Sequence, residues 1–176
     1  MAEEEDKNKY AYIPAFYFKV AFLELGVEIG DIETRFQEVS GIQEEMTVEE
    51  IEEGGINEYV HKLPKRTKFS NLVLKRALST VPSVIAKWAD NAILNYKFQL
   101  CQVNVSLMKA VKADKETKYE EVKTWHFFGA YPVKIQWSDL NAQKNDLVIE
   151  TLELAFRNVT RSGEAIEPKI EEKDKK

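Results

Sequence analysis

The stretch that decides the fold is Ser40–Pro64, SGIQEEMTVEEIEEGGINEYVHKLP. Two extended-type arms meet at Gly54-Gly55, and glycines supply the positive φ that a tight hairpin turn requires. Between Gln43 and Glu58 there are seven glutamates and no lysine or arginine. The pattern therefore predicts a long, acidic β-hairpin.

This hairpin has too few apolar residues to be held firmly on its own domain. A two-stranded ribbon standing alone is marginal in water, so we expect it to gain stability on another subunit. The sequence-predicted arm residues for such a contact are Met46, Val48, Glu49, Glu50, Ile51, Ile56 and Tyr59.

A basic segment follows directly, and it is the candidate partner of the acidic arm. Its cations are Lys62, Lys65, Arg66 and Lys68. If the acidic arm of one copy met the basic segment of the next, the contact would be head to tail, and such contacts close into rings. The alternative is that the acidic hairpin is only a soluble surface that discourages edge-to-edge aggregation.

The whole chain has the composition of a folded soluble protein: 176 residues, 44% hydrophobic and 31% charged. We expect a polar extension over residues 1–9, one β domain over 10–160 and a charged tail over 161–176. The net charge of −5 argues against a nucleic-acid binder. The start MAEEEDKNK is acidic where a secretory signal would be basic and then apolar, so synthesis in a cytoplasm is expected.

Alternating apolar residues predict a mainly β fold, an antiparallel sandwich or barrel with one helix and the protruding hairpin arm. The helix is expected to be capped at Ser79 or Thr80, to have Pro82 in its first turn and to run through Leu94, with Trp88 closing one end of the β structure. A charged turn is expected over Ala110–Glu121. The expected strands outside the hairpin are Phe16–Phe22, Thr34–Val39, Phe69–Leu78, Phe98–Met108, Val122–Phe128, Tyr131–Trp137 and Leu147–Val159.

The residues give no catalytic, cofactor or metal site. A Cys101–His126 dyad is the enzymatic alternative, but Cys101 lies in an apolar stripe, which favours a packed core thiol. The other histidine, His61, is distant, so no ligand-pair spacing exists for a metal. No phosphate-binding glycine motif is present either.

Several motifs together resemble the tail-tube protein family of contractile phages and extracellular contractile injection systems. The match spans about residues 10–160 in the same order throughout and is specific in combination. It is carried by Phe36–Gly41 (FQEVSG), Glu53–Asn57 (EGGIN), His61–Pro64 (HKLP), Phe69–Arg76 (FSNLVLKR), Trp88 and Glu150–Phe156 (ETLELAF).

The resemblance implies a structural inner-tube subunit that forms stacked hexameric rings. Its partners would be other copies, a contractile sheath protein, baseplate and cap proteins, and cargo in the lumen; the assembled particle would be extracellular. The polar face of Gln102, Asn104 and Ser106 is a candidate lumen lining, with an ordinary outer surface as the alternative. The other functions left open are a baseplate-proximal tube paralogue, a β-barrel carrier of small ligands and a hydrolase that uses His126.

Overall fold

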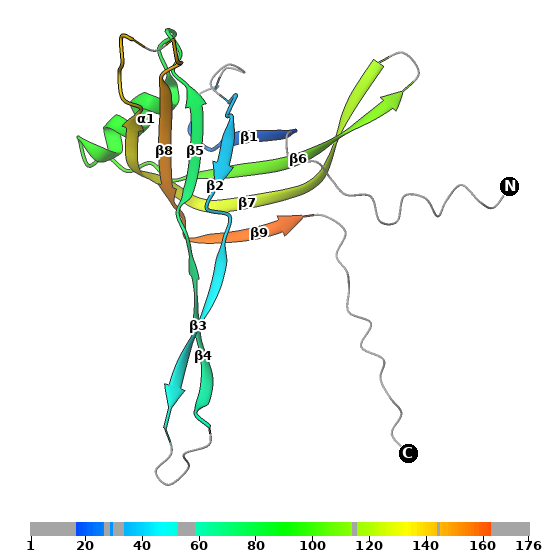
Figure 1. Ribbon diagram of the computed structural model, residues 1–176, viewed down its shortest axis with the longest axis vertical. Coiled ribbons are helices and arrows are strands. Elements are labelled where there is room, and N and C mark those ends of the chain that lie inside the picture. Colours follow the sequence, from blue (N-terminus) through cyan, green and yellow to red (C-terminus); the bar gives the residue numbers. More distant parts are fainter. Residues whose placement is uncertain are drawn as a thin grey trace, which may run out of the picture.

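The computed structural model describes residues 17–26, 29, 34–52, 59–113, 116–143 and 145–162. Its elements, in chain order, are β1 (Phe18–Leu23), β2 (Glu38–Ser40), β3 (Glu44–Ile51), β4 (His61–Phe69), β5 (Leu72–Ala77), α1 (Val84–Ile93), β6 (Cys101–Ala113), β7 (Glu116–Trp137), β8 (Ile149–Ala155) and β9 (Asn158–Ser162). The mainly β fold with one helix and a protruding hairpin is confirmed (Figure 1).

One long strand, β7, belongs to two sheets. Its first part pairs with β6 on one side and β9 on the other, and β1 extends this first sheet beyond β6. Its second part pairs with β8, which continues to β5 and β2 in the second sheet. Every one of these pairings is antiparallel, and Figure 1 shows the strands of the two sheets running crosswise. Gly129, with φ of 62°, lies at the corner between them.

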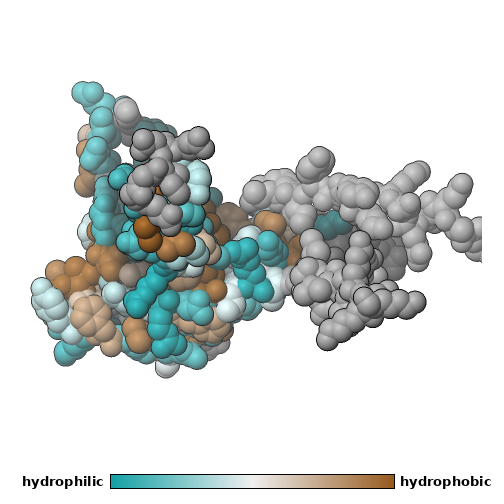
Figure 2. Space-filling model, turned by 90° about the horizontal axis from the view of Figure 1, so that it is seen from below, coloured by the Kyte–Doolittle hydropathy of each residue, from teal (hydrophilic) through white to brown (hydrophobic). Residues whose placement is uncertain are grey.

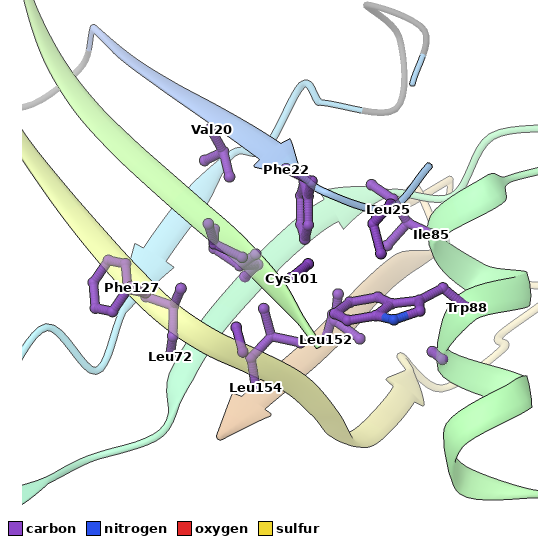
Figure 3. Close-up of a cluster of buried hydrophobic side chains, with 14 of the residues drawn as sticks. Val20, Phe22, Leu25, Leu72, Ile85, Trp88, Cys101, Phe127, Leu152 and Leu154 are labelled. Carbon is purple, nitrogen blue, oxygen red and sulfur yellow. The ribbon is translucent and has the colours of Figure 1, made fainter. Parts of the chain in front are cut away.

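The core fills the space between the two sheets. Alternation places Val20 and Phe22 of β1 and Leu72 and Leu74 of β5 inward, and each is less than 9% exposed. Figure 3 shows Val20, Phe22 and Leu72 gathered with Cys101 of β6, Phe127 of β7, and Leu152 and Leu154 of β8, and Leu74 belongs to the same cluster. A ligand carrier would need an open apolar interior, whereas Phe127 and its neighbours occupy this one.

The helix closes one end of this core, as the sequence predicts. Ile85, Trp88, Ala89 and Ala92 of α1 are buried, and the Trp88 indole Nε1 donates to the Gln99 carbonyl oxygen at 2.9 Å. The expected start of the helix is wrong. Its N-cap is Ser83, whose hydroxyl accepts from the Ala86 amide, so Pro82 precedes the helix. Among the described helices none could span a membrane.

Several strand boundaries differ from the expectation. The charged segment Ala110–Glu121 is not a turn: β6 and β7 continue through it as a hairpin, because β propensity and cross-strand pairs outweigh its charge. Gly129 bends one strand rather than separating two. The single strand expected over Leu147–Val159 is divided into β8 and β9, which pair with different parts of β7.

Three further boundaries move by a few residues. Thr34–Val39 is not a strand; β2 is the shorter Glu38–Ser40. The strand expected over Phe69–Leu78 is β5, which begins at Leu72, because Phe69 ends β4. β9 reaches Ser162, two residues past the expected domain end at 160.

Candidate assembly interface

The hairpin of β3 and β4, hereafter the arm, stands clear of the two sheets (Figure 1). Its register pairs Glu44 with Phe69 at the root and Ile51 with His61 toward the tip. At about 3.4 Å per residue, the eight residues of β3 extend roughly 27 Å. The Gly54-Gly55 turn and Ile56 lie outside the described residues.

The arm presents its apolar side chains to solvent. Met46 is 61% exposed, Val48 52% and Tyr59 55%, and Ile51 and Leu63 are also exposed. Apolar residues gathered on a free ribbon are unusual for a surface without a partner. Met46, Val48, Ile51 and Tyr59 of the predicted arm are thus at the surface of the protomer, and their contact with another subunit stays a prediction.

Two ion pairs cross the arm within one chain. The Lys62 ammonium lies 3.3 Å from the Glu50 carboxylate, and Lys65 lies 3.2 Å from Glu49. The return strand β4 runs past Pro64, where the stretch that predicts the hairpin stops, and continues to Phe69. The basic segment is the return strand of the acidic one, because opposite charges across an antiparallel pair are favourable. These four exposed groups are already compensated, so the apolar residues are the stronger basis for a contact between copies.

The root of the arm is tied to the domain. The Arg161 guanidinium of β9 forms an ion pair with the Glu44 carboxylate. The hydrogen bond from Arg161 and its positive charge hold the pKa of Glu44 below its usual value. The Phe69 and Phe156 rings lie 5.6 Å apart beside this pair. Together these contacts fix the direction in which the arm leaves the domain.

The backbone also constrains the root. Gly41 has φ of 82°, and a Cβ built there would lie 1.9 Å from the Asn71 carbonyl oxygen. Only glycine accepts both the conformation and this approach.

The face of the first sheet that points away from the core is polar. Asn104 of β6 accepts from Gln102 at 2.9 Å, and its Oδ1 lies 3.0 Å from His126 Nδ1. On the other side His126 Nε2 lies 3.0 Å from the Ser162 hydroxyl of β9. Ser106 is on this face too, but only 6% exposed, and it hydrogen-bonds the Thr124 hydroxyl at 2.9 Å. The three candidate lumen residues thus lie on one continuous, hydrogen-bonded face.

No Cys101–His126 dyad forms. Cys101 is 1% exposed and belongs to the core cluster, whereas His126 is held on the opposite face of the sheet by Asn104 and Ser162. Burial, with a smaller contribution from Glu24, raises the pKa of the Cys101 thiol to about 12. In the part of the chain that the structure describes, no cluster of metal-ligating side chains is found.

The fold and this site define a class: a structural β domain with one helical plug, an exposed apolar arm and a polar sheet face. Residues 14–160 match the family described as T4-like virus tail tube protein gp19, and the chain belongs to that family. It is a structural inner-tube subunit of contractile injection systems, so the resemblance seen in the sequence is confirmed.

Solved structures give the same fold. A chain in the 6-fold symmetrised cryo-EM structure of the anti-feeding prophage (AFP) baseplate is 27% identical, with a TM-score of 0.76 and coverage of 88% of this chain and 97% of that chain. A chain of the PVC sheath-tube complex in the extended state, from an extracellular contractile injection system, is 22% identical, with a TM-score of 0.67 and coverage of 89% and 94%. Hcp1 from Flavobacterium johnsoniae is 17% identical, with a TM-score of 0.50 and coverage of 84% and 96%. None of the curated proteins matches the chain.

The assignment of the arm and lumen residues to contacts stays a prediction, and two residues that the structure places beside them were not among the candidates. Arg161 and Ser162 had both been assigned to a charged tail. Only the alternation of Asn158, Thr160 and Ser162 with Val159 could have indicated a strand there.

Proposed function

We propose that this protein forms hexameric rings that stack into a hollow tube within a contractile sheath, and that the tube acts outside the cell as a conduit for cargo. The exposed apolar arm is the observation that carries the proposal. It is supported by the likeness to a chain in a 6-fold symmetrised baseplate. Other similar chains belong to a sheath-tube complex and to a tube-terminating cap, which makes sheath, cap and baseplate proteins the expected partners.

The strand order of the first sheet supports a ring that is closed by side-by-side contacts between copies. Among the described strands, β1 and β9 are its two edges, and each presents unpaired backbone groups. Because strand directions alternate across β1, β6, β7 and β9, the β9 edge of one copy would run antiparallel to the β1 edge of the next. Repeating this head-to-tail contact closes a ring with a continuous inner sheet.

In such a ring the polar face of Gln102, Asn104 and Ser106 would line the lumen. A hydrogen-bonded, largely uncharged wall would let a hydrated cargo pass without strong adhesion. The apolar residues of the arm, including Met46, Val48 and Ile51, would seat on a neighbouring copy and hold the rings together. Contraction of the sheath would then drive the tube through a target envelope.

A baseplate-proximal ring is the second candidate. It is favoured by the identity of 27% with a chain of the AFP baseplate structure, against 22% with a chain of the PVC sheath-tube complex. The two candidates differ in extent of assembly. A main tube subunit alone should form long tubes, whereas a terminal subunit should stop at single rings.

Negative-stain microscopy of the purified protein over a range of concentrations tests the proposal. We expect rings or tubes that accumulate as concentration rises. A second sample, with residues 45–68 replaced by Asn-Gly, should remain folded by circular dichroism but monomeric by size exclusion. Leu140→Ser is the matched control, because Leu140 is 81% exposed and lies outside the arm, so this variant should assemble normally.

Two results would contradict the proposal at different points. If the full-length protein stays monomeric at high concentration, the proposal that it forms a tube is refuted. If a variant without the arm still polymerises, only the assignment of the arm as the interface is refuted.

A further inference from the structure

A pair of tyrosines lies beside the hairpin that β6 and β7 form beyond the first sheet. The pairing of β1 with β6 ends at Phe18 and Leu107, whereas β6 and β7 stay paired as far as Ala113 and Glu116. Figure 1 shows this two-stranded extension projecting past β1. Because two strands without a third neighbour are only marginally stable in water, contacts at the base of the extension decide how firmly it is held.

Tyr17 and Tyr119 make a contact of this kind. Tyr17 directly precedes β1, and its carbonyl oxygen accepts from the Met108 amide of β6 at 2.9 Å. Tyr119 is part of β7 and lies opposite Ala110 of β6. Since β6 is the strand between β1 and β7, the two side chains meet across it. Their ring centroids are 4.9 Å apart, with an angle of 48° between the ring planes.

The two phenol groups are hydrogen-bonded to each other. The bond with Tyr17 raises the pKa of the Tyr119 hydroxyl above its usual value, so Tyr119 is a neutral phenol at neutral pH. In a tyrosine ring the two ortho carbons are bonded directly to the carbon that carries the hydroxyl. A hydrogen bond between the hydroxyls therefore also brings ortho carbons of the two rings toward each other.

Both rings can be reached from solvent. Tyr17 is 37% exposed and Tyr119 49%. Exposure alone does not single them out, because Tyr96 is 80% exposed and Figure 2 shows hydrophobic residues scattered among hydrophilic ones over the surface. The distinguishing feature is the partner: Tyr59 has a ring contact with His61 and Tyr131 with Phe98, whereas Tyr17 and Tyr119 contact each other.

Two phenols held in contact can be joined by one-electron oxidation. Each ring gives one electron to the oxidant and its hydroxyl proton to water, which leaves two tyrosyl radicals. A carbon–carbon bond then forms between one ortho carbon of each ring. The hydrogen that each of these carbons carried passes through water to the phenol oxygen, so the product, dityrosine, has both hydroxyls restored. Hydrogen peroxide, acting through a peroxidase, takes up the two electrons and two protons and becomes two molecules of water.

We propose that Tyr17 and Tyr119 form an oxidative coupling site, at which peroxide and a one-electron peroxidase-type catalyst join the two rings as dityrosine. The cross-link fastens the segment before β1 to the β6–β7 extension by a covalent bond. The inference concerns a single protomer, so it does not depend on assembly.

The cross-link has a consequence for stability. Tyr17 and Tyr119 are about 100 residues apart in the chain, and a bond that closes so long a loop removes many conformations from the unfolded state, as a disulfide does. In the folded state the rings are already in contact. Oxidation therefore restricts the unfolded chain more than the folded one, and the oxidised protomer is the more stable form.

Peroxidase treatment of the dilute full-length protein tests the site. The protein is exposed to a haem peroxidase and an equimolar amount of hydrogen peroxide. Dityrosine fluorescence measures the yield, and mass spectrometry of proteolytic peptides locates the bond. We expect a monomer that has lost two hydrogens and a cross-linked peptide pair that contains Tyr17 and Tyr119. Tyr119→Phe should lower the yield about tenfold or more, because coupling within one chain depends on holding both reacting rings together.

Tyr96→Phe is the matched control. It removes one hydroxyl, as Tyr119→Phe does, but from a more exposed tyrosine. If exposure decided the reaction, this variant would lose the most product, whereas we expect its yield to equal that of wild type. Tyr17→Phe, which removes the other hydroxyl of the pair, should repeat the loss seen with Tyr119→Phe, and circular dichroism checks that all three variants are folded.

Urea unfolding gives a second readout. Oxidised wild type should unfold at a higher urea concentration than untreated wild type, whereas Tyr119→Phe should unfold at the same concentration before and after treatment. If the native monomer couples chiefly through Tyr96, or gives no peptide pair containing Tyr17 and Tyr119, the inference is refuted. It is refuted equally if both folded phenylalanine variants of the pair keep the wild-type yield.

Discussion

Arg76 of β5 joins its own strand to three other parts of the fold. Its guanidinium Nε donates to the Glu150 carboxylate at 2.6 Å, and a second nitrogen donates to the Ser83 hydroxyl at 2.7 Å. The same group lies 5.7 Å from the centre of the Phe36 ring. Arg76 is 6% exposed and Glu150 4%, so both charges are inside the domain. One residue thus connects β5, β8, the helix N-cap and the segment that leads to the arm.

Breaking this buried pair should be costly, while replacing it should not. Arg76→Met leaves the Glu150 charge buried without its partner and should lower the free energy of unfolding by roughly 3–5 kcal/mol. The double variant Arg76→Met, Glu150→Leu should recover most of that loss. Urea unfolding of dilute protein measures both.

Lys75→Met is the matched control. Lys75 neighbours Arg76 and pairs with Glu38 at 2.8 Å, but both side chains are more than a third exposed. An exposed pair contributes about 0–1 kcal/mol. Equal losses for Lys75→Met and Arg76→Met would show that burial of the Arg76 pair has no special role.

The Cys101 thiol should resist alkylation in the native protein. Its pKa is raised to about 12, mainly by burial, so almost no thiolate exists at pH 8. Iodoacetamide should modify it slowly in buffer and within minutes in guanidinium. Because the folded pKa lies above the unfolded value of 9.0, Cys101 should also lower stability as pH rises from about 9 toward 12, and Cys101→Ala should remove that slope. Rapid native alkylation would contradict the burial.

The sequence predicts which side chains point into the core more reliably than it predicts which residues those side chains contact. The alternation in LVLKRA places Arg76 in phase with Leu72 and Leu74, so its inward position was available from the pattern. Its partner Glu150 lies 74 positions away, and no local pattern indicates that pairing.

At the scale of elements, the arm is held together by the β3–β4 backbone ladder, with charge pairs across it, while its apolar residues are left exposed. Glu49 and Glu50 are compensated by Lys65 and Lys62 on the return strand. Pairs this exposed contribute little. The exposed apolar residues, Met46 and Ile51 among them, have no comparable partner on the described part of the same chain.

Substitutions in the arm should separate these two contributions. Met46→Asp with Ile51→Asp should abolish assembly, because it places charge where apolar area is buried between copies. Glu49→Lys with Lys65→Glu, which exchanges the two signs within the hairpin, should assemble close to normally. Sedimentation velocity measures both. If the charge exchange alone prevents assembly, electrostatic contact between copies is stronger than the pairing within one chain implies.

The elements themselves were largely predictable, and the pairings between them were not. The hairpin, the helix and most strands follow from periodicity and turn residues. The length of β7 could not be predicted in this way. In a sequence Gly129 indicates the end of a strand, whereas in the structure it bends a strand that continues. The positions of Cys101 and His126 on opposite faces of the sheet likewise follow from the strand pairing and its pleat, which the sequence alone does not give.

At the scale of the molecule, stability should depend on protein concentration. Association that buries the arm stabilises the folded state by mass action. A hundredfold rise in concentration should therefore raise Tm by roughly 5–10 °C. Scanning fluorimetry of wild type and of the variant lacking residues 45–68 tests this, and the variant should show no such rise. A Tm of wild type that is independent of concentration would argue against assembly through the arm.

The 22-residue strand β7 has a mechanical consequence for such an assembly. Its backbone passes through both sheets without interruption, so a thrust received by one sheet reaches the other along covalent bonds instead of across rows of hydrogen bonds. A subunit built in this way resists shear between its own layers. Under load, it should be the seams between neighbouring subunits that yield first, leaving each building block intact.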